Sequence, residues 1–335
     1  MTFLSIGDLA QIFQTRRETA TLTADLQRLT QEVASGRRND LRSEITGDFG
    51  SLAAIESSLA RITSFSRIAG ESVVELDTAQ AALGRIEADG QRVASALLLS
   101  QTASQPNAVD AAAREAGDAF ASAIATLNTT VGGRSLFAGV ATDGPALLPA
   151  EQILTDLETA VAGATTAADL RDAVFAWFAP GGGFETGAYV GSATEQAPRR
   201  ISPEAQIDPL PRANDPAIAG VLSGAALAAL VDRGALIGQP EERLAAAGFA
   251  GERLLSATPD FIGLRANLGV EQETLALAQQ ALVAEQGAFE IARADLISAD
   301  PFTAASELEA TRSQLETLYL LTSRLSQLSL TSFLR

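Results

Sequence analysis

Several residue types that carry enzyme chemistry are missing from this chain of 335 residues. It has no cysteine and no histidine, and all 24 of its basic residues are arginine. The lack of histidine excludes a Ser-His-Asp triad and a Cys-His pair, and zinc sites built from Cys and His are excluded as well. Without lysine, the chain has neither a Schiff base nor a phosphate-binding loop that depends on one. Catalytic sites built on Asp and Glu carboxylates are not excluded by these absences.

Aromatic residues and long apolar runs are also scarce. Aromatics make up 5% of the chain, with a single tryptophan, whereas apolar residues reach 47%. Much of that apolar content is Ala and Leu, which is typical of helix–helix seams. No apolar run approaches the roughly 18 residues of a membrane span. Met1–Phe13 lacks the basic and apolar parts of a cleaved signal peptide, so we expect none.

Charge of one sign dominates, and the net charge is −17. A strongly acidic chain lacks the basic footprint that nucleic acid requires, and anionic membrane surfaces repel it. We interpret the acidity as a solvated surface that promotes solubility. Neither nucleic acid nor membrane is an expected partner.

The carboxylate pairs in the sequence do not form a recognisable catalytic site. Glu241 with Glu242, and Glu307 with Glu309, have no cluster of aromatic or polar residues around them, so charged helix faces explain them. The glycine run 181–183 follows a proline and is typical of a turn more than of a phosphate cradle. The sequence therefore predicts no catalytic residue, no cofactor and no metal site.

Long amphipathic helices are predicted at both ends of the chain. Those of the N-terminal part cover 3–34, 51–103 and 107–130. Those of the C-terminal part start at Thr258-Pro259 and at Asp300-Pro301, where a proline suits the first helical position. After Pro259, apolar residues recur at every seventh position, a specific signal for a coiled-coil seam. These residues are Phe261, Leu268, Leu275, Leu282, Phe289 and Leu296.

The middle of the chain has a different composition, with denser proline and glycine. A capping box of Thr166 and Asp169 predicts the start of one of its short helices. The predicted elements are helices at 150–163 and 166–178, short edge strands within 184–210, and helix starts at Asp215-Pro216 and Gln239-Pro240.

These patterns predict a mainly α fold, an elongated antiparallel bundle of long helices from both chain ends with a small mixed α/β distal domain inserted in the middle. Short connections favour antiparallel neighbours, so both termini are expected at one pole. The predicted parts are terminal assembly helices at 1–45 and 300–335, a helical rod domain at 46–140 and 258–299, and a distal inserted domain at 141–257.

The apolar stripes of the two terminal helices need a covering surface. A pair made only of helices 3–34 and 301–335 leaves much of each stripe in water, and each fully buried leucine contributes roughly 1.5–3 kcal/mol. We therefore predict that these helices are surfaces between subunits. The predicted assembly interface consists of Leu22, Leu26, Leu29, Val33, Leu308, Leu315, Leu318, Leu321, Leu325 and Leu328.

Four stretches carry recognisable motifs: LQRLTQEVASGRR at 26–38, LNTTVGGRSLFAGVATDG at 127–144, LRANLG at 264–269 and LSQLSLTSFLR at 325–335. In their order and spacing these motifs resemble the flagellin superfamily. GAYVG at 187–191, followed by Arg200-Ile201-Ser202, is similar to the distal domain of that family. Each motif has modest specificity alone, whereas the set spans the whole chain.

Within the superfamily, the chain looks most like the hook–filament junction proteins, the hook-associated proteins of the FlgL type. Family members commonly carry an Asn-Pro-(Ser)-Asp-Asp-Pro-like segment after the first helix, where this chain has Asn39-Asp40-Leu41-Arg42-Ser43. The Lys-Asp-Asp-rich segment of filament flagellins is also missing there, and the C-terminal end differs from the common flagellin ending. The last two departures favour a junction protein over a filament subunit, whereas the first bears on the packing of the segment after the first helix.

The resemblance implies a structural protein of the extracellular bacterial flagellum, not an enzyme. It implies export through the flagellar type III channel without a cleaved signal peptide. It also implies assembly with copies of itself in a ring, and contacts with a neighbouring hook-associated protein and with flagellin. An export chaperone is expected on the C-terminal helix.

Two alternatives remain open at this point. A filament flagellin would share the helical pattern of both ends. A cytoplasmic coiled-coil scaffold would explain the apolar seams as a soluble oligomer that is not exported.

Overall fold

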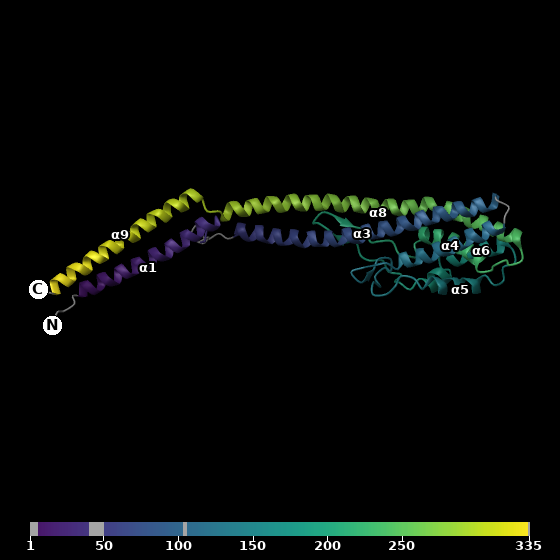
Figure 1. Ribbon diagram of the computed structural model, residues 1–335, viewed down its shortest axis with the longest axis horizontal. Coiled ribbons are helices and arrows are strands. Elements are labelled where there is room, and N and C mark those ends of the chain that lie inside the picture. The colour runs from purple at the N-terminus through teal and green to yellow at the C-terminus, as the bar shows by residue number, and fades with distance from the viewer. Residues whose placement is uncertain (1–5, 40–49, 103–105, 334–335) are drawn as a thin grey trace. The chain divides into compact units, whose positions relative to one another are not determined.

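The computed structural model describes residues 6–39, 50–102 and 106–333, and over these ranges the chain is mainly α-helical (Figure 1). The predicted mainly α fold class is therefore confirmed. The chain divides into two compact units. Unit 1 comprises Met1–Arg61 and Ala284–Arg335, and unit 2 comprises Ile62–Val283.

Unit 1 is built on the two terminal helices, α1 (Ile6–Ser35) and α9 (Pro301–Phe333), which pack side by side (Figure 1). A short antiparallel backbone contact ties the end of α1 to the segment before α9, where Ala299 N–H donates to the Gly36 carbonyl over 3.0 Å. Gly36 has a φ of 66°, the left-handed conformation with which many helices end. The two helices predicted to form the terminal pair therefore do so.

The start of α9 lies at the predicted Asp300-Pro301, where Asp300 caps the helix. Its carboxylate accepts the hydroxyl of Thr303 over 2.8 Å and the N–H of Phe302 over 3.0 Å. The Thr303 hydroxyl first, and then the Phe302 N–H, lower the pKa of Asp300, because both stabilise its charged form. Pro301 occupies the first helical position, where no N–H is needed.

The two longest helices, α3 (Gly50–Thr102) and α8 (Pro240–Ile297), run antiparallel. In unit 2 their register is fixed by side-chain pairs, Gln272 with Asp77 and Arg265 with Glu87. The predicted seven-residue pattern faces the core over most of its length. Phe261, Leu268, Leu275 and Leu282 are at most 5% exposed, and Phe289 and Leu296 are half-buried.

The predicted helix start at Thr258-Pro259 is wrong, because α8 continues through Pro259. An interior proline lacks the backbone donor and normally costs about 3 kcal/mol. Here Pro259 itself is exposed, while Leu254 and Phe261 on either side of it are at most 2% exposed. Burial of both flanking segments holds the helix continuous across the proline.

The core of unit 2 surrounds α7 (Pro216–Asp232), in which every residue from Ile218 to Val231 is buried. A helix that is apolar on all sides must be enclosed by other elements. It packs along α4 (Pro106–Leu127), and Gly224 lets α8 come close, because a Cβ there would lie 2.8 Å from the Leu254 side chain. As predicted, α7 begins at Pro216. Among the described residues, no helix is long and apolar enough to cross a membrane.

Residues 141–257 share this core with α3 and α4. Two short helices, α5 (Ala150–Ala160) and α6 (Ala167–Phe178), pack against each other and against α7. The predicted capping box of Thr166 and Asp169 is present at the start of α6. The boundary between the two compact units passes through α3 and α8. It does not test the three predicted parts, which stay a prediction.

The strands are short and form two-stranded ladders. Gly132 and Gly133 join the first pair with φ values of 58° and 78°, as a type I′ turn requires. The strands are β1 (Thr130–Val131) with β2 (Arg134–Ser135), and β3 (Arg199–Arg200) with β4 (Gln206–Ile207), both antiparallel. The predicted strand region also contains a π-helical turn, η1 (Phe184–Ala188), because Phe184 packs on the aromatic end of α6.

Candidate functional site

The predicted assembly residues lie on α1 and α9, the two helices that pack side by side. They differ in exposure, from fully buried to half-exposed. Leu29 is 2% exposed, Leu22, Leu26, Leu308, Leu315 and Leu318 are half-buried, and Val33 and Leu321 are 42% and 52% exposed. The side chains of Leu325 and Leu328 lie outside the described residues.

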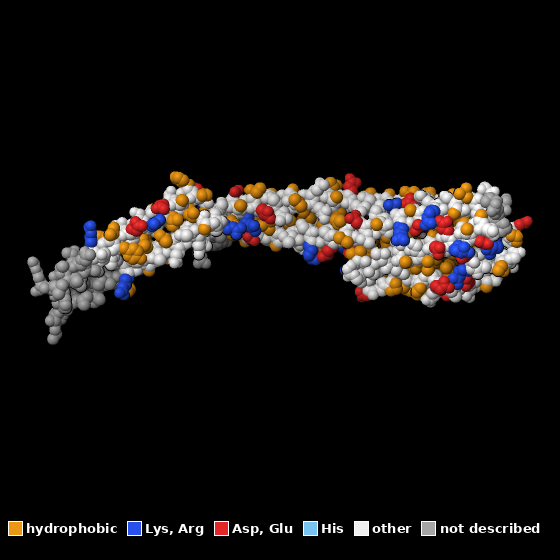
Figure 2. Space-filling view, in the orientation of Figure 1, with side chains coloured by type: hydrophobic (Ala, Val, Ile, Leu, Met, Phe, Trp, Pro, Cys, Tyr) orange, Lys and Arg blue, Asp and Glu red, His pale blue; other side chains and the backbone are white. Residues whose placement is uncertain are grey.

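This pair of helices buries little apolar surface. Among the described side chains of α1 and α9, only Leu29 and Ala304 are fully buried apolar residues. Large apolar side chains remain in water, and Figure 2 shows apolar groups on the surface of the pair. They include Phe13, Phe302, Tyr319 and Leu320, which are 53–81% exposed. Exposed apolar side chains of this size make the pair a candidate for contact with another protein surface.

A buried carboxylate, that of Glu32, lies in the last turn of α1. Glu32 is 6% exposed, and it accepts Nη1 of Arg28 over 3.2 Å and the N–H of Asn39 over 2.8 Å. A buried charge persists only when it is paired and hydrogen-bonded. Glu32 thus fixes the chain where it leaves α1. The sequence pattern did not single it out, since a glutamate near a helix end is ordinarily exposed.

Two of the groups considered for chemistry, Glu242 and the glycine run, have structural partners. Glu242 accepts the N–H of Ala167 over 2.6 Å at the first turn of α6. In the glycine run, Gly181 N–H donates to Glu185 over 2.7 Å and Gly182 N–H donates to the Ala179 carbonyl. These N–H groups therefore form a turn and do not point toward a phosphate. The described residues contain no cluster of three or more metal-ligating side chains.

Comparison with known proteins gives a match in the C-terminal part of the chain. Residues 256–334 match the model of the bacterial flagellin C-terminal helical region, which covers most of α8 and all of α9. The resemblance to the flagellin superfamily is thereby confirmed over this segment. No curated protein matches the chain.

The solved structures with similarity include one from Vibrio parahaemolyticus that is provisionally assigned as a flagellar hook-associated protein. It is 13% identical in sequence and superposes with a TM-score of 0.40. The similarity covers 70% of this chain and 94% of the other.

The family match indicates a structural protein of the flagellum, and therefore not an enzyme. It supports association with further copies and with other flagellar proteins, outside the cell. The matched segment contains α9 but not α1, and the exposed apolar side chains of this pair make it the candidate functional site.

Proposed function

We propose that the chain is a subunit of the junction between the hook and the filament of the bacterial flagellum. It is exported through the flagellar type III channel without a cleaved signal peptide. A cytoplasmic chaperone covers its C-terminal helix before export. Outside the cell it assembles with copies of itself in a ring, next to a hook-associated protein on one side and flagellin on the other.

The observation that carries this proposal is the exposed apolar surface of the α1–α9 pair, of which α9 lies in the segment that matches the flagellin C-terminal region. Leu320 and Phe302 are 66% and 81% exposed in the single chain. Each fully buried side chain of this size contributes roughly 1.5–3 kcal/mol, so neighbouring subunits gain by covering them. The same surface needs protection before assembly, which is the role assigned to the chaperone.

The filament subunit is the alternative within the same family, and the C-terminal match suits both. The junction is favoured by the segment after α1, where the motifs of filament flagellins are absent. That segment, at 40–43, lies outside the described residues. A cytoplasmic scaffold is disfavoured by the flagellin match.

Deletion of the gene tests the proposal. Cells without the junction are expected to export flagellin that cannot attach, so unassembled flagellin monomer accumulates in the medium and filaments are missing. Restoring the gene on a plasmid should return both to normal. If flagellin itself disappears from the cells and the medium, the chain is the filament subunit and the proposal is wrong. An antibody that finds the chain only in the cytoplasm would instead favour the scaffold.

A further inference from the structure

The solvent side of α8 in unit 2 carries an apolar stripe that the proposed function does not use. Val270 and Leu277 come two residues after the buried Leu268 and Leu275, so they lie on the opposite side of the helix. We name this stripe the α8 edge, and its exposed members are Leu255, Pro259, Ile262, Ala266, Val270 and Leu277. The leucine, isoleucine and valine side chains among them are 48–60% exposed.

The α8 edge has the spacing of a helix seam. Apolar residues that recur three, four or seven positions apart form a stripe that normally packs against another helix. The buried seven-residue pattern on the other side of α8 already packs in the core of unit 2. Within the described parts of the chain nothing covers the α8 edge, since every member is exposed. The stripe is therefore a candidate contact surface for another molecule.

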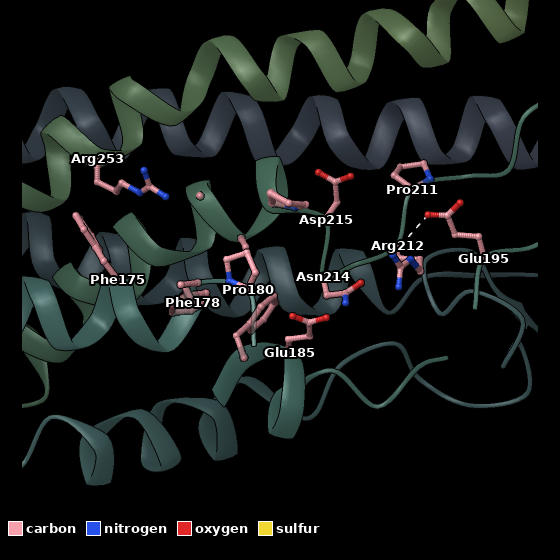
Figure 3. Close-up of a pocket in the computed structure, with 15 residues that line it drawn as sticks. Phe175, Phe178, Pro180, Glu185, Glu195, Pro211, Arg212, Asn214, Asp215 and Arg253 are labelled. Carbon is pink, nitrogen blue, oxygen red and sulfur yellow. Dashed lines mark hydrogen bonds and ion pairs between the residues drawn. The ribbon is translucent and has the colours of Figure 1, made fainter. Parts of the chain in front are cut away.

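The arginines of α8 in unit 2 turn away from the α8 edge. Arg243 pairs with Asp110 of α4 at 2.6 Å, and Arg265 pairs with a glutamate of α3. The guanidinium carbon of Arg253 lies 5.1 Å from the centre of the Phe175 ring, and Arg253 lines the cavity between α6, α8 and the loop before α7 (Figure 3). The positive charges of this part of α8 are therefore engaged inside unit 2.

The exposed charged groups beside the α8 edge are carboxylates. Glu252, Asp260 and Glu273 are exposed, and none of them forms an ion pair or hydrogen bond within the described chain. An apolar stripe beside unpaired negative charges fits a partner surface that is apolar and carries positive charge. Two α8 edges placed against each other would bring like charges together, so a second α8 edge does not fit.

The solvent side of α3 in unit 2 offers the fitting surface. Val74 and Ala81 come two residues before the buried Leu76 and Leu83, so they point away from the core. We name this stripe the α3 edge, and its exposed members are Arg67, Val74, Ala81, Arg85 and Ala88. Val74 is 53% exposed, and the two alanines leave room for larger side chains of a partner.

Arg85 supplies the positive charge of the α3 edge. It is exposed and forms no ion pair with any described residue. The other charged groups on this side of α3 are engaged within the chain. Arg67 pairs with Glu71 at 2.9 Å, and Asp77 accepts Nε2 of Gln272 over 2.6 Å. The α3 edge thus combines small apolar residues with an unpaired positive charge.

The two edges are matched in register. Within one chain the antiparallel pair places Gln272 opposite Asp77 and Arg265 opposite Glu87. A second copy with the same direction and no shift along the helix axis would place edge residues at the same levels. The facing pairs are then Leu277 with Val74, Val270 with Ala81 and Ile262 with Ala88. At two of these levels a large side chain meets an alanine, as interlocking helices require.

We propose that the α8 edge of one copy packs on the α3 edge of a second copy. Each edge lies on the side of its helix opposite the buried face that joins α3 and α8, so one copy can contact two others. Such a contact between unlike surfaces is heterologous, and it closes into a ring when the rotation between copies allows it. The contact is separate from the α1–α9 pair and goes beyond the proposed function, because it belongs to unit 2 alone.

The absence of cysteine allows a site-specific cross-linking test. Val270→Cys on the α8 edge and Ala81→Cys on the α3 edge are made as separate full-length chains, one with a size tag. The purified chains are concentrated, treated with a short bis-maleimide and separated by denaturing electrophoresis. The mixture should give a cross-linked dimer of the two chains, whereas each variant alone should give little. A chain with both substitutions should give a ladder of dimers, trimers and longer products.

Two matched controls separate this contact from random collision. Thr155→Cys on α5 is exposed but lies on neither edge, so its mixture with Val270→Cys should give little dimer. Arg85→Glu in the Ala81→Cys chain should lower the yield by about 5-fold or more, because it places a carboxylate against the acidic α8 edge. Arg134→Glu makes the same charge change on an exposed arginine of β2 and should leave the yield unchanged.

A second cysteine pair, Leu277→Cys with Val74→Cys, keeps the test decisive if a variant of the first pair is unfolded by circular dichroism. The proposal is overturned if the folded pairs cross-link no more than the Thr155→Cys control. It is also overturned if Val270→Cys alone cross-links as well as the mixture, which would mean a contact between like surfaces. Equal yields with Arg85→Glu and Arg134→Glu would count against the α3 edge as the partner. None of these results bears on the junction function, which the gene deletion tests separately.

Discussion

The terminal pair in unit 1 and the helices of unit 2 differ in how much of their apolar surface is buried. Both contain long amphipathic helices with apolar seams, and unit 2 also contains α7, which is apolar on all sides. In unit 2, α7 is enclosed on all sides and α4 packs along it, so one continuous core forms. In unit 1, α1 and α9 bury only Leu29 and Ala304 fully among their described apolar side chains. An apolar seam closes only when enough helices surround it, and otherwise stays a surface for another molecule.

The largest expected effect is the difference in the free energy of unfolding when a phenylalanine is truncated in each of the two regions. Phe120→Ala in α4 removes a ring that is 0% exposed and should lower the free energy of unfolding by about 3–5 kcal/mol. Phe302→Ala in α9 removes a ring that is 81% exposed and should change it by less than about 0.5 kcal/mol. Urea unfolding followed by circular dichroism measures both. Equal losses would mean that the terminal pair is as well packed as unit 2.

The next effect uses two prolines that occupy different helix positions. Pro259→Ala should raise the free energy of unfolding by about 2 kcal/mol. An interior proline costs about 3 kcal/mol. Part of this gain is lost because alanine leaves the unfolded chain more conformational freedom than proline does. Pro301→Ala, at the first position of α9, is the matched control and should have little effect. Both are read from urea unfolding. A destabilised Pro259→Ala variant would show that the core depends on a proline-specific geometry in α8.

A smaller effect on stability but a large one on assembly is expected for Leu321→Asp. Leu321 is 52% exposed, so the substitution should change the free energy of unfolding by less than about 0.5 kcal/mol. Under the proposed function it should nevertheless prevent incorporation into flagella, because it places a charge in the subunit contact. Ser313→Asp adds the same charge on α9 without removing a leucine and should assemble. Electron microscopy and antibody labelling of complemented cells measure assembly. Normal assembly of Leu321→Asp would exclude this side chain from the interface.

The smallest effect concerns two helix starts in acid. The Thr303 hydroxyl lowers the pKa of Asp300, and the Thr166 hydroxyl lowers the pKa of Asp169. A lowered folded-state pKa means that stabilisation is complete above the ordinary carboxyl pKa, near about 4, and is lost as the pH falls through the folded value. Both helix starts should therefore fray below about pH 4.

The comparison predicts that α9 frays more than α6. Ala167 and Leu170 in the first turn of α6 are at most 2% exposed, whereas Phe302 in the first turn of α9 is largely exposed. Hydrogen exchange of these turns, corrected for the intrinsic pH dependence, measures the difference. Asp300→Asn should abolish the acid effect in α9, since asparagine caps without a titrating charge. Equal fraying of both helix starts would argue against a role for tertiary burial.

Local features were predictable from the sequence because they depend on neighbouring residues. The helix start at Asp300-Pro301 and the capping box of Thr166 and Asp169 each follow from one short segment. The buried register from Phe261 to Leu282 follows from a repeat within one helix. The motifs that resemble flagellin are likewise contiguous, and the match at 256–334 confirms that resemblance over its segment.

Features that join distant segments were decided by the tertiary structure alone. The sequence predicts a helix start at Pro259, yet α8 continues through it. The burial of Leu254 and Phe261 on either side stabilises the helix more than the missing N–H of the proline destabilises it. The buried carboxylate of Glu32 and the cavity that joins α6, Asn214 and Arg253 have no continuous sequence signal. The sequence by itself determined that this protein is helical, carries apolar seams and resembles flagellin. Only the tertiary structure decided which seams are enclosed, because burial depends on how many elements surround a helix.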